Sequence, residues 1–117
     1  MNKTLREQDY LEHIKEAIGR IQRYLSGKDE QAFLSDSLLQ DGVIRNLEII
    51  GEAVSKLSPD LKGQYRHVPW GEIAGMRNRL IHGYFAVNLK MVWDTVERVL
   101  PEFLTRIEAI QDGLRKP

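Results

Sequence analysis

Five residues in the segment 69–85, PWGEIAGMRNRLIHGYF, could act together on a phosphate group: Arg77, Asn78, Arg79, His82 and Tyr84. An arginine offers a planar fork of N–H donors that matches phosphate oxygens, and it stays charged at any working pH. A histidine titrates near neutrality and can therefore accept or donate a proton. Because an RNA 2′-hydroxyl supplies its own nucleophile, a histidine base and a charge-stabilising arginine would suffice for metal-independent cleavage.

The spacing of these residues decides which side chains can meet. On an ideal helix, Asn78 and His82 are four positions apart and share one face, so Asn78 could orient His82 or contact the phosphate. Arg77 is five positions from His82, about 140° round the helix axis, so its long side chain or unwinding at Gly83 must close the gap. Simpler interpretations remain open, because a histidine near a helix C-terminus is a common cap and Asn78 can be a plain polar residue. Arg79 is better explained as a solvated or dimer-interface residue that adds positive charge.

Other polar and aromatic residues favour structural roles. Glu48 and Glu52 are four positions apart, which indicates a row of ion pairs on a helix surface rather than acid–base catalysis. No His, Asp and Glu residues have the spacing of a metal site, and no phosphate-binding glycine loop is present, so no metal or cofactor is expected. The remaining candidates are interpreted as surface histidines or as core or interface anchors, namely His13, His67, Trp70 and Trp93.

Helical periodicity runs along the chain and predicts an all-α fold. Apolar residues recur at spacings of three and four in three segments and form an apolar face in a fourth, and no alternating pattern of strand type occurs. We therefore expect an up-and-down bundle of four main helices plus short helical pieces, forming a single domain over residues 1–117. The four apolar stripes are Leu11, Ile14, Ile18, Ile21 and Leu25; Val43, Leu47, Ile50, Val54 and Leu57; Ile73, Ala74 and Leu80 or Ile81; and Leu89, Val92, Val96, Val99, Phe103, Ile107 and Ile110.

Capping residues predict where these helices begin and end. Gly27 is suited to ending the first helix, and Asn88 to capping the last. Ser35, Asp36 and Ser37 are three competing N-caps for the second helix, and the sequence does not choose among them.

Glycine and proline mark special points within the helices. Gly42 and Gly51 each cost about 1 kcal/mol relative to alanine inside a helix, which indicates close approach of a neighbouring helix. The Ser58-Pro59 pair is typical of a cap followed by the first residue of a short helix. Pro101 removes a backbone donor and predicts a kink near Glu97.

Composition and charge exclude several classes of protein. The 117 residues include no cysteine, which rules out a disulfide scaffold, a thiolate nucleophile and cysteine-ligated metal sites. The 17 basic and 17 acidic residues give zero net charge, which argues against coating nucleic acid through bulk positive charge but allows a local basic site. No apolar signal segment and no membrane-spanning run of about 18 apolar residues is present, so a cytoplasmic location is expected.

The string RNRLIHGY, Arg77 to Tyr84, resembles the signature of the HEPN superfamily, in which arginine, four to six residues and then histidine mark an RNase site. It is most similar to the HepT branch, the toxin of HepT–MntA toxin–antitoxin modules, whose pattern adds a tyrosine two positions after the histidine. The segments 45–53, 68–70 and 92–93 also resemble that family, so the similarity covers nearly the whole chain.

The resemblance implies a helical-bundle homodimer in which the two motifs face each other across a cleft. It implies endoribonuclease activity with Arg77 and His82 as catalytic residues. It also implies a partner, an MntA-like minimal nucleotidyltransferase antitoxin that transfers AMP from ATP onto Tyr84. The alternative is a non-catalytic helical module that binds a nucleotidyltransferase partner or RNA.

Overall fold

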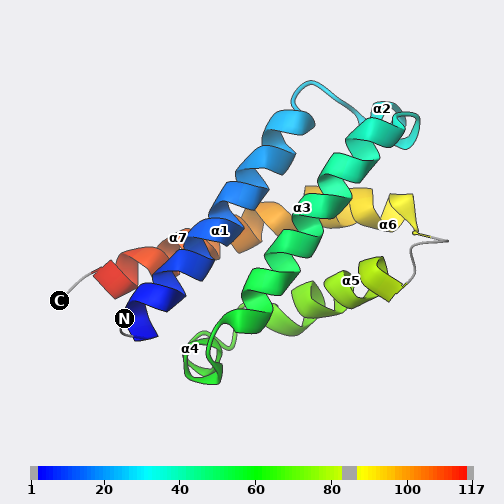
Figure 1. Cartoon of the computed structure of the whole chain (residues 1–117). Helices are drawn as coiled ribbons and strands as arrows, with labels where there is room; N and C mark the ends of the chain where they lie inside the picture. The colour runs from blue at the N-terminus through cyan, green and yellow to red at the C-terminus, as the bar shows by residue number, and fades with distance from the viewer. Residues whose placement is uncertain (1–2, 83–86, 116–117) are drawn as a thin grey trace.

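All regular elements in the described part of the chain are helices, as predicted (Figure 1). The computed structural model describes residues 3–82 and 87–115. None of the helices in these ranges combines the length and apolar character needed to cross a bilayer. In chain order the elements are α1 (Lys3–Tyr24), α2 (Glu30–Leu34), α3 (Ser37–Lys56), α4 (Pro59–Gln64), α5 (Trp70–His82), α6 (Leu89–Asp94), the π-helical turn η2 (Thr95–Val99) and α7 (Leu100–Arg115).

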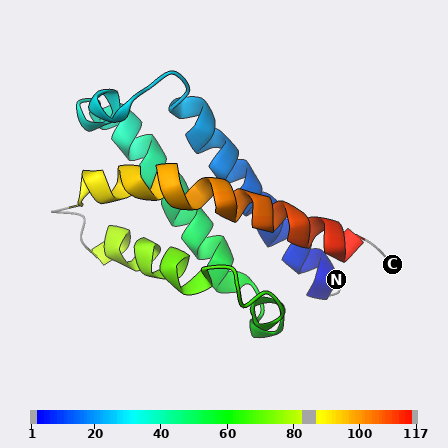
Figure 2. The same ribbon diagram turned by 180° about the vertical axis from the view of Figure 1, so that it is seen from behind.

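Three long elements and one composite helix form the bundle. Helices α1 and α3 lie side by side, and α5 packs along the C-terminal half of α3 (Figure 1). Seen from behind, α6, η2 and α7 follow one another as a single long helix that crosses this layer (Figure 2). Helices α2 and α4 are the short pieces, so the expected arrangement of four main helices is confirmed.

The core is built from the predicted apolar stripes. In α1, Leu11, Ile14, Ile18 and Ile21 are all fully buried, and Leu25 beyond the helix is half-buried. Both tryptophans are buried, as expected of core anchors. The Trp70 ring lies edge-on to Phe103 with ring centroids 5.9 Å apart, and the Trp93 ring lies against Phe33 at 5.6 Å.

The helix boundaries follow the predicted caps. Gly27 has a φ of 74°, the left-handed conformation that glycine adopts at no steric cost. Of the three competing caps, Asp36 is the one used, because its side chain accepts a hydrogen bond from the Leu39 amide. Ser58 and Asn88 cap α4 and α6 in the same way. Gly83, the glycine at which unwinding could bring Arg77 toward His82, lies outside the described residues.

Two buried polar residues join helices that are distant in sequence. The Glu7 carboxylate on α1 accepts hydrogen bonds from the Ser58 amide at 3.0 Å and the Ser58 hydroxyl at 2.6 Å. The Asn46 side chain accepts a hydrogen bond from Arg20 Nε at 2.7 Å and donates one to the Gly42 carbonyl at 2.8 Å. These bonds satisfy polar groups that would be costly to bury unpaired.

Pro101 is accommodated by a π-helical turn over Thr95–Val99. In a regular α-helix the proline ring would clash with the carbonyl of Glu97, and the wider turn relieves that crowding. The Leu100 amide donates to the Thr95 carbonyl, five residues back. Because the turn holds an extra residue, Leu100 is buried and Val99, which the sequence pattern placed in the apolar stripe, is only half-buried. The irregularity lies where a kink was expected, but it is a π-helical turn instead of a kink.

Candidate active site

The contact between α3 and α5 is centred on Gly51 and Arg77. A Cβ atom added at Gly51 would overlap Arg77 Cβ and would lie only 2.8 Å from Cδ and 2.9 Å from Cγ. The stem of the arginine therefore lies directly against the backbone of α3, which only a glycine permits. The close helix approach predicted from Gly51 is confirmed. At Gly42 the neighbour is the ring of Tyr24, with the nearest carbon 3.2 Å from the added atom.

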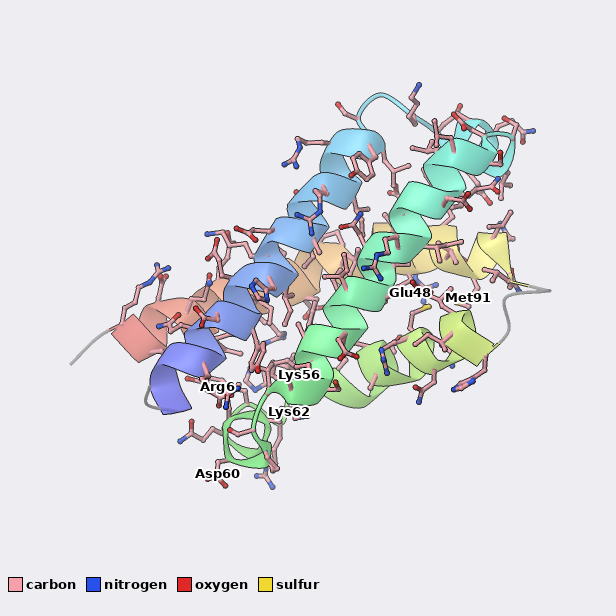
Figure 3. The ribbon with its side chains drawn as sticks, viewed as in Figure 1. Arg6, Glu48, Lys56, Asp60, Lys62 and Met91 are labelled. Carbon is pink, nitrogen blue, oxygen red and sulfur yellow. The ribbon has the colours of Figure 1, made fainter. Side chains whose placement is uncertain are left out.

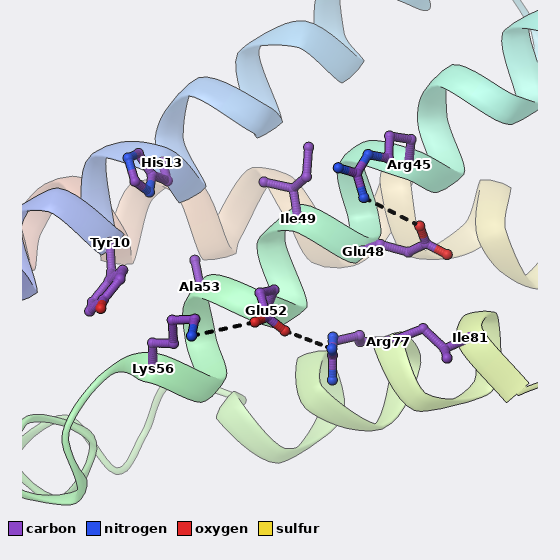
Figure 4. A pocket seen from close by; sticks show the side chains of 10 residues that line it. All are labelled: Tyr10, His13, Arg45, Glu48, Ile49, Glu52, Ala53, Lys56, Arg77 and Ile81. Atoms are coloured by element: carbon purple, nitrogen blue, oxygen red, sulfur yellow. Dashed lines mark ion pairs between the residues drawn. The ribbon is translucent and has the colours of Figure 1, made fainter.

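The charged end of Arg77 is held by the residue that follows this glycine. Arg77 Nη2 lies 2.6 Å from Oε2 of Glu52 and forms a short ion pair with it. Lys56, one turn further along α3, places its Nζ 3.6 Å from Oε1 of the same carboxylate. One carboxylate is thus shared by two cations (Figure 4). The arginine side chain is 29% exposed, so part of it remains open to solvent.

The ion pairs continue along the surface of α3. Arg45 and Glu48 are paired at 3.9 Å, and Figure 3 places Glu48 and Lys56 on α3, with Lys56 close to the end of the helix. The interpretation of Glu48 and Glu52 as members of an ion-pair row is confirmed. The row does not stop at α3, since Glu52 reaches across to α5.

These side chains line an open cavity of about 540 Å³, which we call the Arg77 cavity (Figure 4). It extends across α1, α3 and α5 and presents three cations and two carboxylates, together with aromatic side chains from α1. Its lining residues are Tyr10, His13, Arg45, Glu48, Ile49, Glu52, Ala53, Lys56, Arg77 and Ile81.

The other predicted site residues lie apart from this cavity. His82 is the last residue of α5. Both His82 and Asn78 are exposed, and neither lines the Arg77 cavity. Arg79 lines a different hollow, which also contains Lys90 and Arg98. Tyr84 lies outside the described residues. Among the described residues of one chain, Arg77 and His82 therefore do not line one cavity.

Sequence reasoning missed the partners of Arg77. Glu52 and Lys56 share the four-residue spacing of a helical ion pair, which is visible in the sequence. Nothing in that spacing indicates that the carboxylate also reaches an arginine on another helix. The usable signal was the position of Glu52 next to Gly51, because a residue beside a close helix contact is well placed to touch the neighbouring helix.

One amino group near the second hollow has a shifted titration. Lys90 Nζ lies 2.9 Å from Oε2 of Glu30, and this hydrogen bond, with the negative charges of Glu30 and Asp94, raises the pKa of Lys90 above its ordinary value. The pair connects α6 to α2. Within residues 3–82 and 87–115, no three His, Asp or Glu side chains are grouped so that they could hold a metal ion.

Comparison with known proteins gives a consistent set of similarities. Residues 14–110 match the family model described as ribonuclease HepT-like. A Thermococcus cleftensis protein named "Probable ribonuclease HepT" is 41% identical over 103 residues, which cover 88% of this chain and 94% of the relative. A Caldanaerobacter subterraneus protein, named as a provisional RNase, is 40% identical over 101 residues, 86% of this chain and 90% of the relative.

A longer relative shares the same segment. A Methanocaldococcus jannaschii protein, named as a gamma-glutamylcyclotransferase and provisional RNase, is 42% identical over 107 residues. These cover 92% of this chain, which spans about half the length of that relative, 48%. No solved structure has significant similarity to the chain.

Proposed function

The chain belongs to the HepT-like ribonuclease family, and we propose that it is a metal-independent endoribonuclease in which Arg77 and His82 carry the reaction. The observation that carries the proposal is the place of Arg77. Its stem is fixed against α3, and its partly exposed guanidinium borders a cavity of about 540 Å³. A cationic fork held in this way is suited to binding a phosphodiester.

The proposed reaction uses groups of the RNA itself. His82 accepts the proton of a 2′-hydroxyl, and the 2′-oxygen attacks the adjacent phosphorus. The bond to the 5′-oxygen of the next nucleotide breaks, and that oxygen takes up a proton from water. Arg77 stabilises the charge that develops on the phosphoryl oxygens. The products are a 2′,3′-cyclic phosphate and a 5′-hydroxyl.

A homodimer would give the exposed His82 a place in this scheme. His82 and Arg77 do not line one cavity within a single chain, so a second copy facing α5 is proposed to complete the site. Two copies of Arg77 and Arg79 would also concentrate positive charge on a protein of zero net charge.

We further propose that the protein is the toxin of a toxin–antitoxin module. Its antitoxin would be an MntA-like nucleotidyltransferase that transfers AMP onto Tyr84, the tyrosine of the motif. The added phosphodiester is negative and bulky, so beside Arg77 it would take the place of a substrate phosphate. Intact-mass measurement with the partner and ATP should show AMP-sized increments in the wild type and none in Tyr84→Phe. Increments that persist in the variant would exclude Tyr84 as the acceptor.

The catalytic assignment is tested with single substitutions in the presence of EDTA. Arg77→Ala and His82→Ala should each abolish RNA cleavage, while His67→Ala, which removes another exposed histidine ten residues before Arg77, should leave it unchanged. The wild-type product should end in a 2′,3′-cyclic phosphate. If both motif variants cleave like the wild type, the site is wrong. If the wild type cleaves no RNA at any concentration, the alternative of a non-catalytic binding module is favoured.

A further inference from the structure

We propose that Glu52 is a positioning residue for Arg77, which holds the guanidinium in the orientation that the reaction requires. This inference rests on the proposed function, because it assigns a role within the same site. It concerns a carboxylate that the arginine–histidine motif does not contain.

The contact between the two side chains is a short ion pair. Arg77 Nη2 lies 2.6 Å from Oε2 of Glu52, and the side chains of Glu52 and Arg77 are 46% and 29% exposed. This ion pair restrains the charged end of a side chain whose stem already lies against α3. Since an arginine carries five N–H donors, one contact at Nη2 leaves other donors free for phosphate oxygens.

Two neighbours of Glu52 complete the arrangement. Gly51 brings α3 against the stem of Arg77, so the arginine cannot withdraw toward that helix. Lys56 lies 3.6 Å from the second oxygen of Glu52 and offsets part of its negative charge. Thus one turn of α3 sets how closely Arg77 approaches that helix. It also sets the direction of the guanidinium and the charge balance around the guanidinium.

A carboxylate beside a phosphate-binding arginine has two opposing effects, and kinetics separate them. Its negative charge repels a substrate phosphate and raises KM. Its hold on the guanidinium lowers the cost of orientation in the transition state and raises kcat. Glu52→Gln nearly preserves the shape of the side chain but removes the charge. Positioning therefore predicts a lower kcat for Glu52→Gln, with KM unchanged or lower.

Glu48 provides a matched control on the same helix. It lies one turn before Glu52, lines the same Arg77 cavity and also carries a negative charge. Its ion-pair partner is Arg45 at 3.9 Å, a largely exposed side chain on α3 itself. Glu48→Gln thus removes the same charge from the same cavity without removing a contact to Arg77.

The experiment compares the wild type, Glu52→Gln, Glu52→Ala and Glu48→Gln as full-length proteins in steady-state cleavage of an RNA oligonucleotide. We expect kcat to fall about 10- to 100-fold in Glu52→Gln and further in Glu52→Ala, since misplacement by about 1 Å can cost 100-fold. The kcat of Glu48→Gln should stay within about twofold of the wild-type kcat. Melting temperatures should match, which excludes unfolding as the cause. A wild-type kcat in Glu52→Gln, or an equal loss in Glu48→Gln, would overturn the proposal.

A second readout keeps this inference separate from the proposed function. If the wild type cuts no RNA, the proposed function fails, and positioning is then read from the Arg77 Nε–Hε signal in ¹⁵N NMR, assigned with Arg77→Lys. Loss of a fixed contact should shift that signal and speed its exchange with water in Glu52→Gln but not in Glu48→Gln. An unchanged signal in Glu52→Gln would show that Glu52 does not hold the arginine.

Discussion

Gly51→Ala tests the packing that places Arg77. The added methyl would overlap Arg77 Cβ, an atom fixed to the backbone of α5, so α5 must move away from α3. Overpacking of this kind costs about 1–3 kcal/mol, and the upper end applies because no flexible group can give way. Alanine returns about 1 kcal/mol through its higher helix propensity. The free energy of unfolding should therefore fall by about 2 kcal/mol.

Urea denaturation followed by circular dichroism measures this loss, which corresponds to a fall of about 8 °C in melting temperature for a chain of this length. The matched control is Gly75→Ala on α5, where the nearest atom to an added Cβ is a mobile arginine nitrogen 3.9 Å away. That variant should be unchanged or more stable by about 1 kcal/mol. RNA cleavage by Gly51→Ala should also fall, because the guanidinium moves with α5.

The reasoning would be refuted by one outcome in particular. If Gly51→Ala is as stable as Gly75→Ala and cleaves RNA at the wild-type rate, the α3–α5 contact does not restrain Arg77. A destabilised but fully active variant would separate packing from catalysis. It would show that the arginine finds its orientation without the close approach at Gly51.

Three further substitutions test contacts elsewhere in the bundle. Glu7→Ala removes two charge-assisted hydrogen bonds to Ser58 and should lower the free energy of unfolding by about 2–3 kcal/mol in urea titrations. Asn88→Ala removes the N-cap of α6 and should cost about 1 kcal/mol, with faster amide exchange in its first turn. Lys90→Met should destabilise slightly at neutral pH. Because the pKa of Lys90 is raised by Glu30, this difference from the wild type should vanish at strongly alkaline pH, as the lysine loses its proton.

The helices were predictable because they depend on local chemistry. The choice among competing caps and the features set by long-range geometry were not predictable. Periodicity and caps such as Ser58 and Asn88 act over a few residues, so both can be predicted from the local sequence. Three adjacent caps compete before α3, and only the folded turn selects Asp36. The form of the irregularity before Pro101 was also beyond the pattern, because a kink and a π-helical turn both relieve the same clash.

For the candidate site, the sequence predicted residues but not their arrangement. The residue types and spacing indicated Arg77 and His82 as candidates, and this stays a prediction. Gly51 indicated a close helix contact, which is confirmed. The identity of that contact depends on how α5 lies on α3, which no local pattern encodes. For the same reason the sequence did not predict the contact between Glu52 and Arg77, because the spacing of Glu52 to Lys56 already explained Glu52 as a member of an ion-pair row.

The π-helical turn over Thr95–Val99 has a consequence for changes in chain length. Such a turn is equivalent to one residue inserted into an α-helix, already absorbed by the bundle. Deleting one residue there would restore regular α-helix while α6 and α7 keep their buried faces. A deletion within α7 itself would rotate all that follows by about 100° and turn Ile107 and Ile110 away from the core. Homologous chains one residue shorter in this long helix should therefore have their gap at residues 95–99.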